Sequence, residues 1–300
     1  MSDTLFEKLS AALPGLRLLE AEPMSRHTSF RIGGPAQVLA CPETEAELTA
    51  LLAACQELGV TPRILGGGTN ILAPDEGVPG VVISTRGLDE LVQREDGSLR
   101  AGAGVPLARL AVFAQRLGLT GLEFAHGIPG TVGGGVYMNA GAYGGELVQV
   151  VTAARFVTLE GEITEYEGEA LGLSYRRSAF MELPGIVLSA DFRLGPGDPE
   201  AILARMRELM ERRRASQPLE LPSAGSTFKR PVGGYAAALI QEAGLKGCRV
   251  GDAAVSEKHS GFVVNLGSAT AADVLTLMSR VRETVKAKSG IELEPEVRIW

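Results

Sequence analysis

The chain has 300 residues, of which 45% are hydrophobic and 22% charged, and its formal net charge is −7. This length suits about two domains, and the apolar content is too high for intrinsic disorder. An acidic chain without a long basic run is a poor general binder of nucleic acid, because phosphate binding uses clustered Lys and Arg. Glycine stands out, since 38 residues are glycine, nearly twice the average share of about 7%.

The cysteines and histidines show no metal-binding or disulfide pattern, so we expect no metal site. Cys41, Cys55 and Cys248 include no C-x-x-C pair and are odd in number, which favours a reducing compartment, the cytoplasm. The N-terminal segment has no signal-peptide pattern. No apolar run reaches the about 18 residues that a transmembrane helix needs, so we expect no membrane partner.

The first half of the chain alternates predicted helices and short strands. Thr44 and Glu47 have the spacing of a capping box, and leucines at helical spacing predict a helix that ends near Gly59. Strands are predicted at 62–65 and 81–83. Extended chain at 101–105 then leads into a helix that starts near Pro106 and has one apolar face.

The second half contains stronger strand patterns and two long predicted helices. A β-hairpin is predicted at 155–166 and a strand at 185–194, followed by a Gly- and Pro-rich linker at 195–199. Helices are predicted at about 201–214 and 270–288, and an alternating strand at 291–300. Because several strands form hairpins among the helices, the pattern favours an α+β fold over a plain doubly wound sheet.

Glycine gathers in clusters that suggest a ligand held by the backbone. The first, Gly66-Gly67-Gly68-Thr69-Asn70, follows a predicted strand, and consecutive glycines let N–H groups turn toward one point, as around a pyrophosphate. It has neither the P-loop nor the G-x-G-x-x-G pattern, and a tight loop without a ligand is an equally good reading of it alone. The second cluster, Gly127–Glu146, loses much entropy on folding, so the two together favour an elongated dinucleotide.

A third cluster, Pro222–Pro231, is small and polar and contains Ser226. It lacks the G-x-S-x-G elbow of serine hydrolases. Read alone, it is equally consistent with a solvated turn and with a serine exposed to a ligand.

Seven motifs, taken in order, resemble the UDP-N-acetylenolpyruvoylglucosamine reductase family of flavoenzymes, which makes a precursor of peptidoglycan. They span residues 28–298 and lie at 28–34, 66–72, 127–146, 174–178, 225–229, 255–259 and 293–298. The chain looks like the shorter form of the family, which lacks a substrate-covering insertion.

The resemblance implies a fold and its division into domains. Residues 1–195 would form an FAD-binding domain of the vanillyl-alcohol oxidase/p-cresol methylhydroxylase type, with lobes at about 1–85 and 86–195. Residues 196–290 would form an α/β substrate-binding domain. Residues 291–300 would be a strand that returns to the flavin domain. The cofactor would be non-covalent FAD, with NADPH as co-substrate.

The reaction that the resemblance implies is reduction of an enolpyruvyl ether to UDP-N-acetylmuramate. Arg176 matches the family position that binds the substrate carboxylate, where a guanidinium stabilises the charge that develops. Glu296 matches a carboxyl group at the same oxygens. Ser226 matches the proton donor, which works only against a strongly basic carbanion and with resupply of the proton through water or Lys229.

The family's binding residues carry over to further positions of this sequence. Expected FAD contacts are Arg31, Gly66, Gly67, Gly68, Thr69, Asn70, Gly127, Ile128, Pro129, Gly130, Thr131, Gly133, Gly134, Asn139 and Arg298. Expected contacts of the UDP-sugar substrate are Tyr175, Lys229, Tyr143 and His259, although His259 is equally suited to a structural hydrogen bond. A monomer is expected.

Two other functions compete with the reductase. One is a flavin-dependent alcohol or sugar oxidase of the same superfamily, in which His126, beside the glycine run, could carry a covalent flavin. The other is a nucleotide-binding regulator without catalysis. Turnover of NADPH and release of the yellow flavin on acid precipitation would separate the three.

Overall fold

The computed structural model describes residues 3–300, and these form two compact units, each assembled from separate segments of the chain. Unit 1 contains the described residues up to Ala21, then Gln37–Gly67 and Pro79–Arg212. Unit 2 contains Glu22–Ala36, Gly68–Val78 and Arg213–Trp300. The predicted domain limits at 195 and 290 stay a prediction, but the chain clearly enters unit 2 before its C-terminal third.

The described residues contain seven α-helices. They are α1 (Leu5–Ala12), α2 (Glu45–Glu57), α3 (Leu107–Arg116), α4 (Val132–Met138), α5 (Pro199–Ser216), α6 (Ala236–Glu242) and α7 (Ala271–Ser289). The chain passes from unit 1 to unit 2 within α5. No helix in the described part of the chain is long and apolar enough to cross a membrane.

The strands are short and mostly antiparallel. Those that lie wholly or mainly in unit 1 are β1 (Leu18–Pro23), β2 (Pro35–Ala40), β3 (Arg63–Leu65), β5 (Val78–Ser84), β6 (Leu91–Gln93), β7 (Leu99–Gly102), β8 (Leu119–Thr120), β9 (Gly141–Ala142), β10 (Gly145–Glu146), β11 (Val151–Thr158), β12 (Ile163–Glu167), β13 (Gly185–Phe192) and β14 (Gly195–Pro196). Unit 2 holds β4 (Ile71–Leu72), β15 (Ser223–Ser226), β16 (Arg249–Val250), β17 (Ala253–Val255), β18 (Phe262–Asn265) and β19 (Arg298–Ile299).

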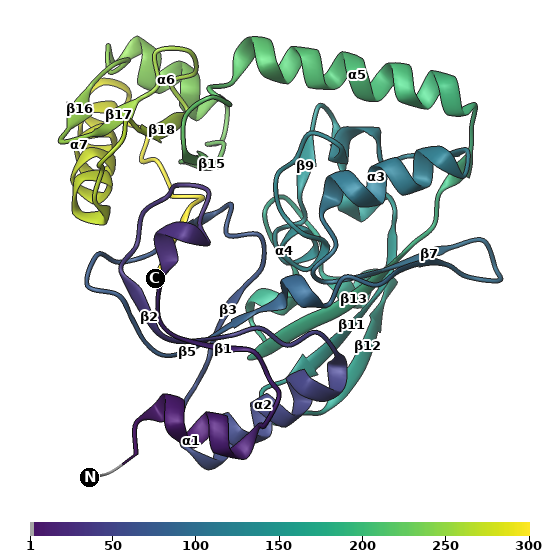
Figure 1. Ribbon diagram of the computed structural model, residues 1–300. Coiled ribbons are helices and arrows are strands. Elements are labelled where there is room, and N and C mark those ends of the chain that lie inside the picture. The colour runs from purple at the N-terminus through teal and green to yellow at the C-terminus, as the bar shows by residue number, and fades with distance from the viewer. Residues whose placement is uncertain (1–2) are drawn as a thin grey trace. The chain divides into compact units, whose positions relative to one another are not determined.

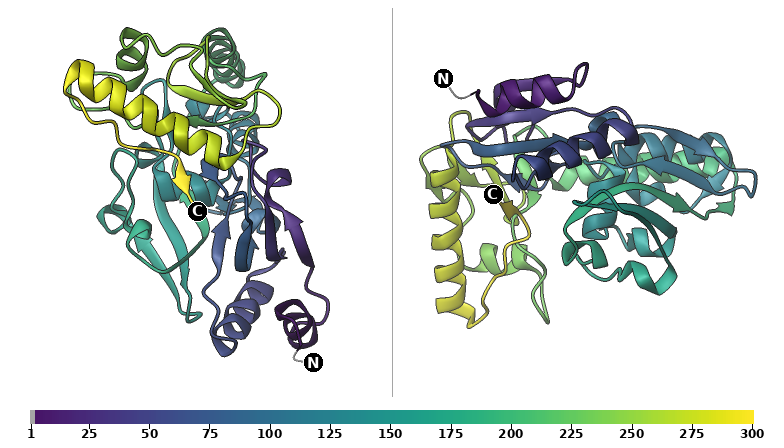
Figure 2. Two further views of the ribbon diagram at one scale, coloured as in Figure 1. Left: turned by 90° about the vertical axis from the view of Figure 1, so that its left-hand side faces the viewer. Right: turned by 90° about the horizontal axis from the view of Figure 1, so that it is seen from below.

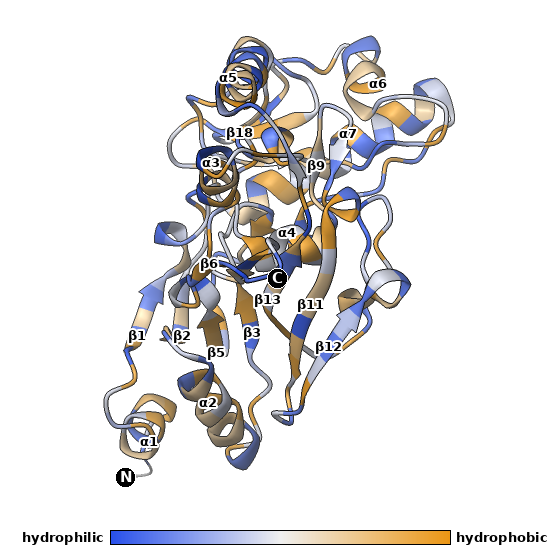
Figure 3. Ribbon diagram, turned by 90° about the vertical axis from the view of Figure 1, so that its right-hand side faces the viewer, coloured by the Kyte–Doolittle hydropathy of each residue, from blue (hydrophilic) through white to orange (hydrophobic). Residues whose placement is uncertain are grey.

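A five-stranded antiparallel sheet in the order β12-β11-β13-β7-β6 forms the centre of unit 1. Helices α3 and α4 lie over it in Figure 1, and their apolar side chains share one core with β7, β11 and β13. In Figure 3, β12 is more hydrophilic than β11 and β13, which matches its exposed position at the sheet edge. Burial of the apolar faces against the helices stabilises this part of the unit.

A second, four-stranded sheet has the order β1-β2-β5-β3, in which β3 and β5 are parallel. The α2 residues Leu48, Leu51, Leu52 and Cys55 are buried in a core that also includes side chains of β2, β5, β11 and β13. This second core therefore joins the two sheets of unit 1. Burial also raises the pKa of the Cys55 thiol to about 11.

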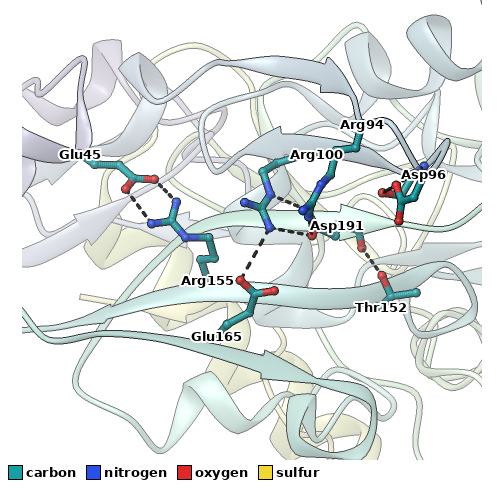
Figure 4. A network of polar contacts seen from close by, with 9 residues as sticks. Glu45, Arg94, Asp96, Arg100, Thr152, Arg155, Glu165 and Asp191 are labelled. Atoms are coloured by element: carbon teal, nitrogen blue, oxygen red, sulfur yellow. Dashed lines mark hydrogen bonds and ion pairs between the residues drawn. The ribbon is translucent and has the colours of Figure 1, made fainter.

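A charged network crosses the large sheet of unit 1 (Figure 4). The buried Asp191 of β13 accepts hydrogen bonds from the guanidinium of Arg100 on β7 at 2.6 and 2.7 Å and from Arg94 at 2.7 Å. These bonds to Asp191 raise the pKa of Arg100. On β11, Arg155 binds Glu45 at the start of α2. The network compensates buried charge between neighbouring strands.

Unit 2 is a smaller α/β unit built on the sheet β15-β18-β17-β16. The long helix α7 lies along this sheet in Figure 2, and Val274, Leu277 and Val281 are buried in its core. The same core takes Phe30, Ile32 and Leu72 from the two early segments of the chain. The C-terminal strand β19 pairs in parallel with β4.

Most predicted elements are present, with local differences. Thr270 and Asp273 form a full capping box at α7, whereas at α2 only half of the predicted box exists, because the Glu47 carboxylate accepts from the backbone of Glu43. The predicted strand at 291–300 is wrong for most of its length, since only β19 is a strand there. The predicted linker at 195–199 instead contains β14, which pairs with β8.

Candidate functional site

The expected site residues divide between the two units. Unit 1 holds Gly66, Gly67, Gly127, Ile128, Pro129, Gly130, Thr131, Gly133, Gly134, Asn139, Tyr143, Tyr175 and Arg176. Unit 2 holds Arg31, Gly68, Thr69, Asn70, Ser226, Lys229, His259, Glu296 and Arg298. The first glycine cluster thus spans the boundary, and the expected catalytic residues come from both units.

In unit 1 the two glycine clusters contact each other. A Cβ at Gly67 would lie 2.8 Å from the Cα of Gly130, closer than side chains tolerate, so this approach of two backbones requires glycine. The guanidinium of Arg86 donates to the carbonyl of Gly67 at 2.9 Å and holds the loop from the side. The sequence suggested two glycine clusters around a ligand, but nothing in it indicated that the two clusters contact each other or that Arg86 binds one of them.

Thr131, at the junction of the two clusters, has a buried hydroxyl without a hydrogen-bond partner among the described residues. A Cβ at Gly66 would lie 2.9 Å from this oxygen, and one at Gly134 would lie 3.9 Å from it. Buried hydroxyls are normally hydrogen-bonded, so an unpaired one beside exposed backbone indicates a place for a polar ligand. Gly134 is the one exposed glycine of α4.

Helix α4 begins just after Thr131, and two of its glycines serve packing within the chain. The N–H of Gly133 donates to the carbonyl of Ala103 at 2.9 Å, and a Cβ at Gly133 would lie 2.8 Å from the Cβ of Ala103. A Cβ at Gly135 would press on Leu107 and Leu147. Of these three neighbouring glycines, only Gly134 therefore has room on its outer side.

In unit 2 the first glycine cluster continues beside the segment around Thr28. A Cβ at Gly68 would lie 2.0 Å from the carbonyl oxygen of His27, and the N–H of Ser29 donates to the Gly68 carbonyl at 2.9 Å. The Ser29 hydroxyl donates to the carbonyl of Ser223 at 2.6 Å. Ser29 therefore ties the glycine cluster to β15, a role that the sequence did not reveal.

The segment that follows Ser226 is joined in unit 2 to the segment that carries Glu296 by a short antiparallel ladder. The N–H of Glu296 donates to the carbonyl of Thr227 at 2.9 Å, and that of Lys229 to the carbonyl of Glu294 at 2.8 Å. Asn70 donates from its Nδ2 to the carbonyl of Glu296 at 3.1 Å. The backbone carrying Glu296 is thus held from two sides.

Ser226 lies at an irregularity of β15. The register with β18 shifts between Ser223 and Ser226, and Gly225 between them has a φ of +76°, which disfavours any side chain there. Irregularities of this kind re-aim the next side chain. A Cβ at Gly225 would have no neighbour within 4 Å, so the strand next to Ser226 is open on that side.

Arg176 lies in unit 1 at the tip of a tight turn. Ser174 and Arg177 exchange two backbone hydrogen bonds of 3.0 Å, and Arg176 between them has a φ of +53°. Its guanidinium carbon lies 5.2 Å from the centre of the Tyr175 ring. A non-glycine residue in this conformation is uncommon and concentrates at functional sites.

The residues expected to contact the substrate differ in the contacts that their side chains make with other residues of the chain. The Lys229 amine forms an ion pair with Glu294. The Nδ1 of His259 accepts from the N–H of Gly261 at 3.2 Å, and burial lowers the pKa of His259. The rings of Tyr143 and Tyr175 are 40% and 43% exposed and so are accessible to a ligand.

Comparison with known proteins places this arrangement in a family. The model of the C-terminal domain of UDP-N-acetylenolpyruvoylglucosamine reductase matches residues 217–300, and that of an FAD-binding domain matches residues 36–167. The UDP-N-acetylenolpyruvoylglucosamine reductase of Agathobacter rectalis is 48% identical, over 100% of this chain and 99% of its own length. The chain belongs to the UDP-N-acetylenolpyruvoylglucosamine reductase family.

Further relatives agree over nearly the whole chain. The reductase of Clostridium novyi is 49% identical over 92% of this chain and 90% of its own. The crystal structure of UDP-N-acetylenolpyruvylglucosamine reductase from Thermus caldophilus superimposes with a TM-score of 0.80 at 38% identity, covering 95% of this chain and 98% of that one. The predicted family, the α+β class and the FAD-binding domain are thereby confirmed.

The chain is an FAD-containing oxidoreductase of this family, and its residues fit the cofactor. The unpaired hydroxyl of Thr131 and the open side of Gly134 offer a polar group beside backbone that no side chain covers. A flavin dinucleotide has phosphate oxygens to meet such a hydroxyl. We therefore take Gly66, Gly67, Gly130, Thr131 and Gly134 as the residues of unit 1 that would hold FAD.

Proposed function

We propose that the chain reduces the enolpyruvyl ether of UDP-N-acetylenolpyruvoylglucosamine to UDP-N-acetylmuramate, with NADPH as the electron donor, in the synthesis of peptidoglycan precursors. The support is the family membership over the full length together with the backbone hydrogen bond from the N–H of Glu296 to the carbonyl of Thr227, the residue after Ser226. Bound FAD supplies the hydride that NADPH has delivered. The double bond gains that hydride on its terminal carbon and a proton on the carbon that carries the carboxylate.

Each of the three expected catalytic residues has a distinct task in this proposal. The Arg176 guanidinium binds the substrate carboxylate and stabilises the negative charge that the enolate places on it. The Glu296 carboxyl group donates a hydrogen bond or proton to the same oxygens. The Ser226 hydroxyl gives its proton to the carbon, and the open strand at Gly225 leaves room for the substrate there.

Lys229 has a supporting task. Its amine is close enough to Glu294 to be fixed by an ion pair, so it presents a positive charge on the same ladder as Ser226. A cation there stabilises the serine alkoxide and so favours transfer of the proton from Ser226 to the substrate carbon. Tyr175 and Tyr143, both exposed, would contact the nucleotide sugar.

The decisive experiment follows the flavin absorbance by stopped flow in two half-reactions. In Ser226→Ala, reduction by NADPH stays within about threefold of the parent, whereas reoxidation by the enolpyruvyl substrate falls by at least about 10²-fold, the scale of a lost proton donor. Ser223→Ala removes the same atom from the same strand and is the matched control. Equal loss of both half-reactions in Ser226→Ala would contradict a role confined to proton transfer.

The remaining expectations belong to the same proposal. FAD is held without a covalent bond, so acid precipitation should release all the yellow colour. Retention of flavin on the protein, with oxidation by O2 after an alcohol is added, would favour the oxidase, in which His126 would be the attachment point. The three cysteines are free thiols, which suits the cytoplasm, and gel filtration should show a monomer. Residues 196–290 would form the substrate-binding domain.

A further inference from the structure

The turn that carries Arg176 is fastened to the end of α4 by two side-chain hydrogen bonds. Asn139, the C-cap of α4, donates from its Nδ2 to the carbonyl of Ser174 at 2.9 Å. On the other side of the turn, the hydroxyl of Ser178 donates to the carbonyl of Tyr137 at 2.8 Å. Both donor side chains are buried, so water has little access to the donor end of either bond.

Both the Nδ2 and the Oδ1 of the Asn139 amide have hydrogen-bond partners inside the chain. Its second Nδ2 hydrogen points to the carboxylate of Glu146 at 3.2 Å, and its Oδ1 accepts from the N–H of Val148 at 2.9 Å. The residue is 0% exposed. An amide with these bonds and no exposed surface is a poor candidate for the direct FAD contact that the resemblance suggested.

The backbone of Asn139 explains why this residue type stands there. Its φ of +43° lies in the left-handed region, where Asn is favoured among residues with a side chain. The same conformation ends α4 and turns the amide toward Ser174. Alanine would lose both properties, whereas glycine would keep the backbone conformation and lose only the amide.

We propose that Asn139 is a positioning residue that fixes the orientation of Arg176 through the turn Ser174–Arg177. The proposal rests on the proposed function, in which Arg176 binds the substrate carboxylate. Arg176 has an unfavourable positive φ, and such a conformation persists only where the surroundings hold it. The two bonds between the turn and the end of α4 are holding contacts, and Asn139 supplies one of them. Its bonds to Glu146 and Val148 fix the amide that makes it.

Because Thr131 is the N-cap of α4 and Asn139 is its C-cap, one short helix connects the proposed FAD loop with the turn of Arg176. A shift of this turn would move the guanidinium relative to the substrate carboxylate. Misplacement by about 1 Å can cost about 10²-fold in rate. Loss of the Asn139 amide should therefore affect the step that uses Arg176 and spare the step that does not.

The test compares Asn139→Gly with the parent holoenzyme in both half-reactions. We expect reoxidation by the enolpyruvyl substrate to slow by about 10- to 100-fold, while reduction by NADPH and the flavin spectrum stay nearly unchanged. In an Arg176→Ala background, Asn139→Gly should have almost no further effect, because residues that act through one another are not additive. Val38→Ala, a truncation in the other core of unit 1, controls for lost stability.

A second measurement does not depend on catalysis. Arg176 and Arg177 are trypsin sites in the turn, and cleavage there requires the turn to open. Asn139→Gly should speed cleavage at this site several-fold in the holoenzyme, as should Ser178→Ala, whereas Val38→Ala should not. Mass spectrometry of the early fragments identifies the site. If Asn139→Gly proves too unstable, Ser178→Ala alone carries both measurements.

Each of the following results would overturn the inference. Equal slowing of both half-reactions, or full additivity with Arg176→Ala, would make Asn139 a purely structural residue. Unchanged trypsin cleavage would show that the amide does not hold the turn. If Arg176→Ala itself left reoxidation intact, the function proposed for Arg176 would fail, and this inference would fail with it. If reoxidation were slow in Arg176→Ala but unaffected in Asn139→Gly, only the inference about Asn139 would be refuted.

Discussion

Gly134→Ala should have opposite effects on the apoprotein and on FAD binding. The new Cβ would lie 3.9 Å from its nearest neighbour, the Thr131 hydroxyl, so the chain itself accommodates it. Gly134 also lies inside α4 with an ordinary helical φ. Replacing glycine by alanine within a helix stabilises it by about 0.5–1 kcal/mol.

The same methyl group would occupy the space that we assign to the cofactor. Forcing an extra methyl into a close contact typically costs about 1–3 kcal/mol, which corresponds to a Kd for FAD weakened roughly 5- to 150-fold. Urea unfolding of the apoprotein measures the first effect. Titration of the apoprotein with FAD, followed by quenching of the flavin fluorescence, measures the second.

Substitutions at two other glycines serve as controls for Gly134→Ala. Gly133→Ala would place its Cβ 2.8 Å from that of Ala103, so it should destabilise the apoprotein instead of stabilising it. Gly195→Ala meets only an ordinary contact of 3.7 Å with Thr120 and should change neither quantity. A Gly134→Ala apoprotein of raised stability that binds FAD as tightly as the parent would refute the assignment of this surface to the cofactor.

Three further predictions concern stability and reactivity. Asp191→Asn should lower the free energy of unfolding by about 2–4 kcal/mol, somewhat below the usual loss for a broken buried pair because Arg94 and Arg100 are partly exposed; a urea midpoint within error of the parent would contradict this. Burial lowers the pKa of His259, so the contribution of this residue to stability is present above the unfolded pKa of about 6.5 and is lost as the pH falls below that value. Thermal melts between about pH 7.5 and 5.5 should show this loss of stability, and the loss should be less steep in His259→Gln. An identical pH dependence of the two proteins would count against this prediction. Because burial raises the pKa of Cys55 to about 11, this thiol should stay unlabelled by a thiol-disulfide reagent at pH 8 while the protein is folded. Labelling of the folded protein at the rate seen in urea would disprove the burial of Cys55.

Local sequence patterns predicted those helices and strands that are determined by interactions between residues close together in the sequence. The capping box at Thr270 and the apolar face of α3 follow from spacings within one or two turns, and both helices start within a residue or two of the expected place. Helix α4 was not predicted, because three consecutive glycines argue against a helix. Tertiary packing decides there, since Gly133 and Gly135 fit against Ala103 and Leu147.

The candidate site shows the same division between local and distant causes. Motifs alone named Ser226 and Glu296, but their segments are joined by backbone bonds between residues about 70 positions apart, which no local pattern encodes. Asn70 and Asn139 were expected to contact FAD. In the structure each donates to the backbone near an expected catalytic residue, and sequence alone gives no sign of which carbonyl an amide will meet.

The order in which unit 2 collects its segments has a consequence for the protein's synthesis. Its core needs Phe30, Ile32 and Leu72 from the first quarter of the chain and Val274 and Val281 from near the end. At about 5–20 residues per second, the early segments leave the ribosome roughly 10–45 s before the last ones. During that interval they expose apolar side chains with no partner, so unit 2 cannot fold vectorially, and chaperones that shield nascent chains should matter more for this unit than for unit 1.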